Sequence, residues 1–127
     1  MAKYFSEDEF RCKCCGTLPP DGVDENLQEL LDDIREEAGQ PIILNCCYRC
    51  DAHNAEVGGV KGSQHNADPC TAADIDASEI GVEELAQIAE SLGADGVGRY
   101  FEDVGTFVHV DVRSGRIGDN YRWTEGG

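Results

Sequence analysis

The chain has 127 residues, of which 40% are hydrophobic and 28% charged, a balance typical of one folded domain over residues 1–127. Its 26 acidic and 10 basic residues give a net charge of -16, which repels phosphate backbones and anionic lipid surfaces. No apolar run approaches the length that crosses a bilayer. The composition therefore argues against nucleic acid or a membrane as a partner.

Two features of the sequence bear on where the protein is made. The segment MAKYFSEDEF carries acids where a secretory signal has an apolar stretch, which predicts a protein that is cytoplasmic as synthesised. Seven cysteines are many for such a chain, but an odd count with adjacent pairs does not fit a fully oxidised disulfide framework. Packed thiols or a disulfide are expected ahead of a structural zinc site, because no clean CxxC spacing occurs. The cysteines are Cys12, Cys14, Cys15, Cys46, Cys47, Cys50 and Cys70.

The first half of the chain predicts a helix and then a strand. Leucine and isoleucine recur at the three-and-four spacing of an amphipathic helix within DENLQELLDDIREEAG, residues 24–39. Asp24 is the expected cap and Gly39 the expected stop. The run IILNCCY, residues 42–48, is β-branched at its start and reads as a buried strand.

The second half is richer in strands. VEELAQIAESLG, residues 82–93, predicts a second amphipathic helix. Strands are expected over residues 71–77, 96–100 and 106–112, with a weaker candidate over residues 121–124. This order of elements predicts an α+β domain whose small, mostly antiparallel sheet is flanked by helices.

The strand candidate TFVHVDV alternates strictly between apolar and polar residues. Phe107, His109 and Asp111 are expected on one face and three valines on the other. The plainer alternative is that His109 and Asp111 form the solvated side of an edge strand. The scarcity of histidine argues against this alternative, because the chain has only three histidines and two of them lie beside acidic residues.

These residue types suit a metal. A catalytic zinc site typically takes three protein ligands from histidine and carboxylate and leaves a fourth position for water. His65, Asp74 and His109 could supply such a set, because a short polar loop separates the first two.

The order of the sequence blocks resembles a known family. SQH at residues 63–65, AAD at residues 72–74 and FVHVDVR at residues 107–113 are similar to the motifs of the M15 zinc peptidases, which include D-alanyl-D-alanine carboxypeptidases. FSEDEFRCKC, YRCDAHNAEVGG and GVGRY resemble further blocks of its short single-domain branch, common in phages and prophages. The likeness covers nearly the whole chain and implies a zinc site on the sheet.

The resemblance also implies residue roles. Zinc is expected to be held by His65, Asp74 and His109, the set already suggested by spacing. Arg49 is expected beside the metal as a catalytic and substrate-binding group, although a surface ion pair is its plainer role. Ser63 is expected to position substrate or to cap its own loop.

Two departures from the family pattern affect these expectations. His65 and Asp74 are nine positions apart where the family usually has seven, so the loop carries two extra residues, and Cys70 stands where a glycine is usual. The second departure is Cys46-Cys47 before YR, where a serine-glycine pair is usual. Separately, Thr106 occupies the position where some branches place the general base. Asp111 is the preferred base, with orientation of His109 as its alternative role. The fallback bases are Asp76, Glu102 and Asp103.

The expected function is that of a zinc metallopeptidase that hydrolyses peptidoglycan stem peptides at a bond next to D-alanine. Its substrate would be reached at the cell wall after release from the cell, as for a phage lysis enzyme, and a monomer is expected. The alternatives are a non-catalytic zinc-binding interaction module and a cytosolic dipeptidase for D-alanyl-D-alanine.

Overall fold

The computed structural model describes residues 4–5, 7–11, 16, 18, 22–47, 70–77, 79–101 and 106–125. Three helices and five strands lie within these ranges. In chain order they are α1 (Glu7–Phe10), α2 (Glu25–Ala38), β1 (Ile43–Cys46), β2 (Ala72–Asp76), α4 (Val82–Ser91), β3 (Gly96–Tyr100), β4 (Phe107–Asp111) and β5 (Tyr121–Glu125). No helix in these ranges is both long and apolar enough to span a bilayer.

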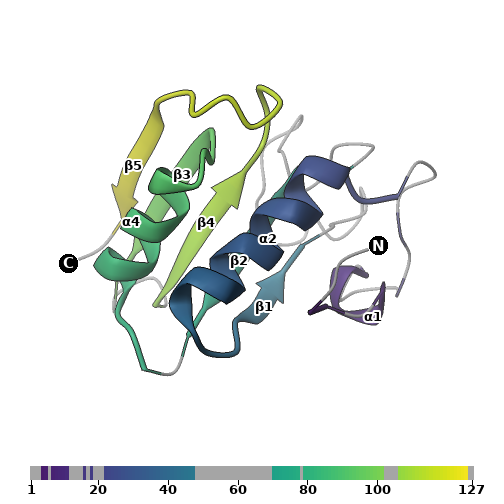
Figure 1. Cartoon of the computed structure of the whole chain (residues 1–127), viewed down its shortest axis with the longest axis horizontal. Helices are drawn as coiled ribbons and strands as arrows, with labels where there is room; N and C mark the ends of the chain where they lie inside the picture. The colour runs from purple at the N-terminus through teal and green to yellow at the C-terminus, as the bar shows by residue number, and fades with distance from the viewer. Residues whose placement is uncertain are drawn as a thin grey trace.

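The strands form one five-stranded sheet in the order β1-β2-β4-β3-β5. Neighbouring strands are antiparallel except for β3 and β5, which run parallel. Strand β4 is therefore central, with β2 on one side and β3 on the other (Figure 1). The prediction of an α+β fold with a mostly antiparallel sheet is confirmed.

The two long helices lie side by side on one face of the sheet (Figure 1). Helix α2 begins where the Asp24 carboxylate accepts a hydrogen bond from the backbone N–H of Asn26, and it ends at Gly39, whose φ of 68° is left-handed. Both predicted ends are confirmed. The apolar sides of the helices pack with valines and isoleucine of the strands in one buried core. Its fully buried members include Leu27, Leu30, Leu31, Ile34, Ile75, Leu85, Val97, Val108 and Val110.

A buried carboxylate organises the loop between β4 and β5. Asp95 is fully buried, and its two carboxylate oxygens accept hydrogen bonds from the backbone N–H groups of Ser114, Arg116, Ile117 and Asp119. Arg116, at a left-handed φ of 61°, also forms an ion pair with Asp33 on α2. These contacts fix the loop, and with it the start of β5, against the rest of the fold.

Candidate active site

The central strand carries the polar residues on the face of the sheet opposite the helices. Val108 and Val110 point into the core with α2 and α4, so alternation places His109 and Asp111 on the other face. His109 is 7% exposed and Asp111 is fully buried. The alternative of a solvated edge strand is therefore wrong, because β4 has a neighbour on each side.

Strand register brings Asp74 to His109. In the antiparallel pair of β2 and β4, Asp74 lies directly opposite His109. Side chains of directly opposed residues share a face and lie close together. Two of the three predicted metal ligands, 35 residues apart in the sequence, are therefore neighbours in the structure.

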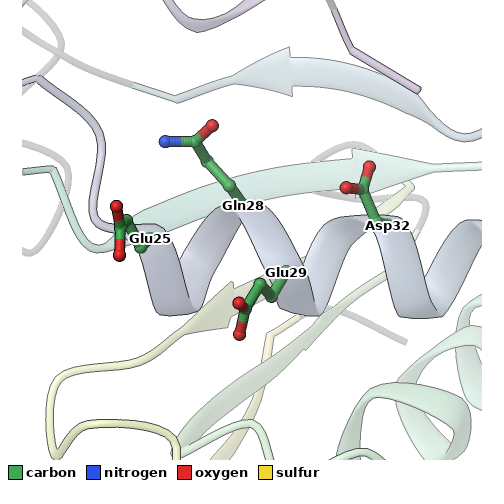
Figure 2. Close-up of a pocket in the computed structure, with 4 residues that line it drawn as sticks. All are labelled: Glu25, Gln28, Glu29 and Asp32. Atoms are coloured by element: carbon green, nitrogen blue, oxygen red, sulfur yellow. The ribbon is translucent and has the colours of Figure 1, made fainter. Parts of the chain in front are cut away.

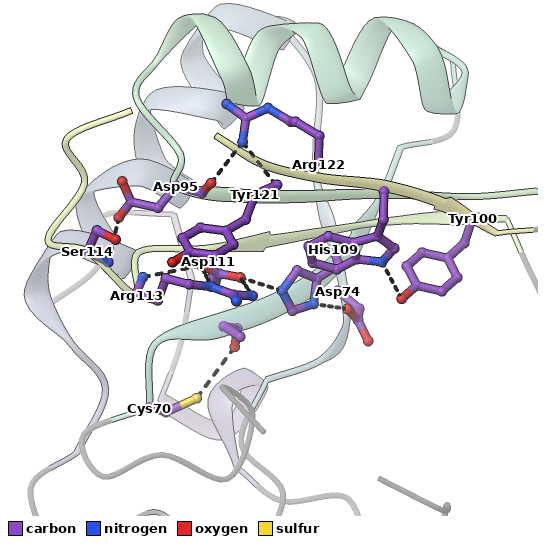
Figure 3. A network of polar contacts seen from close by, with 12 residues as sticks. Cys70, Asp74, Asp95, Tyr100, His109, Asp111, Arg113, Ser114, Tyr121 and Arg122 are labelled. Atoms are coloured by element: carbon purple, nitrogen blue, oxygen red, sulfur yellow. Dashed lines mark hydrogen bonds and ion pairs between the residues drawn. The ribbon is translucent and has the colours of Figure 1, made fainter. Parts of the chain in front are cut away.

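The imidazole of His109 lies between two carboxylates (Figure 3). Its Nε2 is 2.8 Å from Oδ2 of Asp111, and its Nδ1 is 3.2 Å from Oδ1 of Asp74. An ionised carboxylate only accepts hydrogen bonds, and Asp111 makes the shorter of the two contacts, so we assign the ring proton to Nε2, which donates to Asp111. In the neutral ring, Nδ1 then directs its lone pair towards the carboxylate of Asp74. Nδ1 and the Asp74 oxygen are both acceptors, so they favour binding of a proton or a cation between them. The pair of Nδ1 and Asp74 thus has the donor chemistry of a metal site.

Asp111 has a second strong partner in Arg113. The Nε and Nη2 atoms of Arg113 donate to the two oxygens of Asp111 at 2.9 and 2.7 Å. Burial by itself raises the pKa of Asp111, but the hydrogen bonds from His109 and Arg113 outweigh burial and hold this pKa well below its usual range. Asp111 is therefore an ionised group, engaged at both oxygens.

Two glycines of β3 make room for these side chains. A Cβ atom on Gly96 would lie 2.0 Å from Oδ2 of Asp111, and a Cβ on Gly98 would lie 2.4 Å from Cε2 of Trp123. Both glycines face β4 positions of the site, since Gly96 pairs with Asp111 and Gly98 with His109. Only glycine permits this close approach.

The close approach at Gly96 gives a testable prediction. Gly96→Ala should lower the free energy of unfolding by about 1–3 kcal/mol, because the added methyl forces the buried carboxylate of Asp111 away from its partners. Thermal or urea unfolding of the metal-free protein measures this loss. Gly81→Ala is the control, since a Cβ at Gly81 meets no atom within 4 Å. Equal losses in the two variants would show that the contact with Asp111 has no special cost.

Aromatic residues continue the polar face towards β5. The rings of His109 and Trp123 have centroids 4.9 Å apart, and Nε1 of Trp123 donates to the Tyr100 hydroxyl at 2.8 Å. Tyr100 stacks on Phe107 at 4.3 Å. Sequence reasoning did not identify Arg113, Tyr100 or Trp123. Sequence patterns that point to this face of the sheet were present, because Arg113 follows Asp111 at the same two-residue period and glycine occupies alternate positions of β3.

Of the remaining predicted site residues, Asp76 ends β2 and accepts a hydrogen bond from the backbone N–H of Ala77, and the others lie outside the described residues. They are Arg49, Ser63, His65, Glu102 and Asp103, so the predictions made for them stay predictions. Within the ranges that the structure describes, no group of three His, Cys, Asp or Glu residues is arranged to hold a metal ion. Cys70 is buried, and its sulfur lies 3.7 Å from that of Cys47, a contact between thiols that is far longer than a disulfide bond.

A separate pocket of about 190 Å³ lies on α2 (Figure 2). Glu25, Gln28, Glu29 and Asp32 line it, all from the same helix. None of these residues belongs to the strands that carry Asp74, His109 and Asp111. The pocket is therefore distinct from the candidate active site.

Comparison with protein families agrees with the resemblance that the sequence motifs indicate. The family model described as Peptidase M15 matches residues 3–111, which include all of β1 to β4. No curated protein matches the chain closely enough to serve as a relative. The match covers most of the chain and ends at Asp111, the last residue of the strand that holds His109. The chain therefore belongs to the peptidase M15 family.

Proposed function

We propose that this protein is a zinc-dependent peptidase that cleaves peptidoglycan stem peptides at a bond next to D-alanine. The observation that carries the proposal is the pairing of Nδ1 of His109 with Oδ1 of Asp74 at 3.2 Å, in a chain that belongs to a peptidase family. A neutral imidazole nitrogen and a carboxylate oxygen are typical zinc ligands.

The residues fit a zinc ion of the catalytic kind. His109 and Asp74 would hold it together with His65, the third predicted ligand. The hydrogen bond from Nε2–H of His109 to Asp111 leaves Nδ1 as the ligating nitrogen and fixes the direction of its lone pair. When bound, zinc supplies a Lewis acid that polarises a carbonyl group and lowers the pKa of water.

Asp111 has two candidate roles in this site. As a general base it would take a proton from the attacking water and return it to the leaving amine. As an orienting residue it would hold His109 through Nε2–H. Its complete burial and its ion pair with Arg113 favour orientation, because both oxygens already accept hydrogen bonds.

Substrate recognition is assigned to Arg49 and Ser63. A guanidinium group binds a carboxylate or a developing oxyanion through two parallel hydrogen bonds, so Arg49 would hold the negative charge of the substrate. Ser63 would hold the peptide or its own loop. These two roles follow from the family motifs around residues 49 and 63.

The cellular role that fits this activity is cell-wall degradation after release of a cytoplasmic protein, as by a phage lysis enzyme. The net charge of -16 does not favour binding to nucleic acid or to anionic lipid. We propose that the protein acts as a monomer. A non-catalytic zinc module and a cytosolic D-alanyl-D-alanine dipeptidase are the competing functions.

One experiment separates these functions. The wild-type protein should contain about one zinc per chain by elemental analysis and should release new amino groups from purified peptidoglycan. Hydrolysis of D-alanyl-D-alanine without action on peptidoglycan would favour the dipeptidase. Stoichiometric zinc without hydrolysis of either substrate would favour the non-catalytic module, and absence of zinc would reject the metal site.

A further inference from the structure

Strand β5 brings a tryptophan against the imidazole of His109. Trp123 is the only tryptophan in the chain, and it lies beyond residues 3–111, which the family model matches. The parallel pairing of β5 with β3 sets Trp123 opposite Gly98, which in turn lies opposite His109 on β4. Trp123 therefore lies on the same face of the sheet as Asp74 and His109.

The indole is itself held in place. Its Nε1–H donates to the hydroxyl of Tyr100 at 2.8 Å, and the ring of Tyr100 stacks on Phe107. The absence of a side chain on Gly98 lets the indole lie close over β3, where any Cβ would be 2.4 Å from it. Trp123 is thus held by a hydrogen bond to Tyr100 and by close packing over Gly98, both on β3.

Trp123 packs against the ring of His109 through an aromatic contact, whereas the two carboxylates form polar contacts with it. Asp74 and Asp111 contact the two ring nitrogens in hydrogen-bond geometry. The indole packs at a centroid distance of 4.9 Å and a tilt of 49°, an arrangement typical of favourable aromatic pairs. The guanidinium carbon of Arg113 lies 5.9 Å from the ring centroid of Trp123. The imidazole is therefore constrained by its nitrogens and by an aromatic contact.

From these contacts we infer that Trp123 is a positioning residue for His109. By packing on the imidazole it holds the ring orientation in which Nδ1 faces Asp74, and so it raises the affinity of the site for zinc. Residues that orient a metal-binding histidine typically change metal affinity 10- to 100-fold when they are replaced. This inference rests on the proposed zinc site and extends it to a strand outside the family match.

The test measures zinc affinity in place of catalysis. Zinc ions are titrated against a chromophoric chelator with the wild type, Trp123→Ala and Trp123→Phe. Trp123→Ala should bind zinc about 10-fold or more weakly, while Trp123→Phe should regain most of the affinity because an aromatic ring is restored. Thr124→Ala is the control, since it truncates an exposed side chain of the same strand that alternation places on the opposite face of the sheet from Trp123.

A second measurement uses the metal-free protein and does not depend on zinc. The imidazole C–H resonances of His109, identified by their loss in His109→Ala, should move in Trp123→Ala because the ring current of the indole is removed. Circular dichroism of both variants checks that the fold is kept.

Three outcomes are distinguishable. The inference is supported if Trp123→Ala binds zinc more weakly and shifts the His109 resonances while the control variant does neither. Wild-type affinity in Trp123→Ala overturns it and leaves the proposed function intact. Failure of the wild type to bind zinc overturns the metal site, and with it the positioning role of Trp123.

Discussion

Replacing His109 with alanine should abolish both zinc binding and peptide hydrolysis. The variant loses the Nδ1 atom that faces Asp74 at 3.2 Å, and with it one of the three proposed ligands. Loss of a ligand should cost at least as much as loss of an orienting partner, so zinc affinity should fall by at least about 100-fold. Amino-group release from peptidoglycan should fall to the level of a blank without enzyme. Chelator competition and the hydrolysis assay measure the two effects.

The matched variants make this result specific. Asp74→Asn should also weaken zinc binding, because a neutral amide oxygen is a poorer ligand than a carboxylate. Glu29→Gln removes one negative charge from an exposed site on α2, outside the strands of the active site, and should leave affinity and turnover unchanged. Should His109→Ala bind zinc like the wild type while Glu29→Gln does not, the metal would lie elsewhere in the molecule.

The regular elements could be predicted because each leaves a periodic pattern. The leucines of α2 recur every three or four residues, and its ends at Asp24 and Gly39 carry typical capping residues. The alternation in TFVHVDV predicted that His109 and Asp111 share a face, and the sheet confirms it. Local patterns of this kind depend only on residues close in the sequence.

The arrangement of the site depends on long-range pairing, which local patterns do not encode. The central place of β4 became known only from the strand order, and it explains why Asp111 is buried. The parallel pairing of β5 with β3 likewise brings Trp123 to His109. The short helix α1 was not predicted, since four residues hold too little periodicity to read.

The variant Asp111→Asn should distinguish the two roles proposed for Asp111, which are general base and orientation of His109. The Asn side chain keeps an oxygen that accepts from Nε2–H of His109, but it loses the charge that pairs with Arg113. If Asp111 orients His109, zinc affinity should fall about 10- to 100-fold, and turnover at saturating zinc should largely recover. If Asp111 is the general base, zinc affinity should stay near the wild type while kcat falls about 100- to 10,000-fold.

We expect the orienting result, because both oxygens of Asp111 are engaged and its side chain is fully buried. Asp111→Asn should also lower the free energy of unfolding by about 1–3 kcal/mol, since the fully buried side chain loses the charge that accepts hydrogen bonds from the partly exposed Arg113 guanidinium. Asp119→Asn is the matched control, as its carboxylate lies in the following loop and accepts from Ser114.

The double variant Asp111→Asn with Arg113→Gln provides the second check on this assignment. Removing both charges leaves no unpaired ion, so the loss of stability should be smaller than the sum of the two single losses. If the ion pair acts through His109, Arg113→Gln alone should weaken zinc binding in the same direction as Asp111→Asn, but less, because the acceptor of the hydrogen bond from Nε2–H is still a charged carboxylate. Unchanged affinity in Arg113→Gln together with a collapse of kcat in Asp111→Asn would instead identify Asp111 as the group that moves the proton.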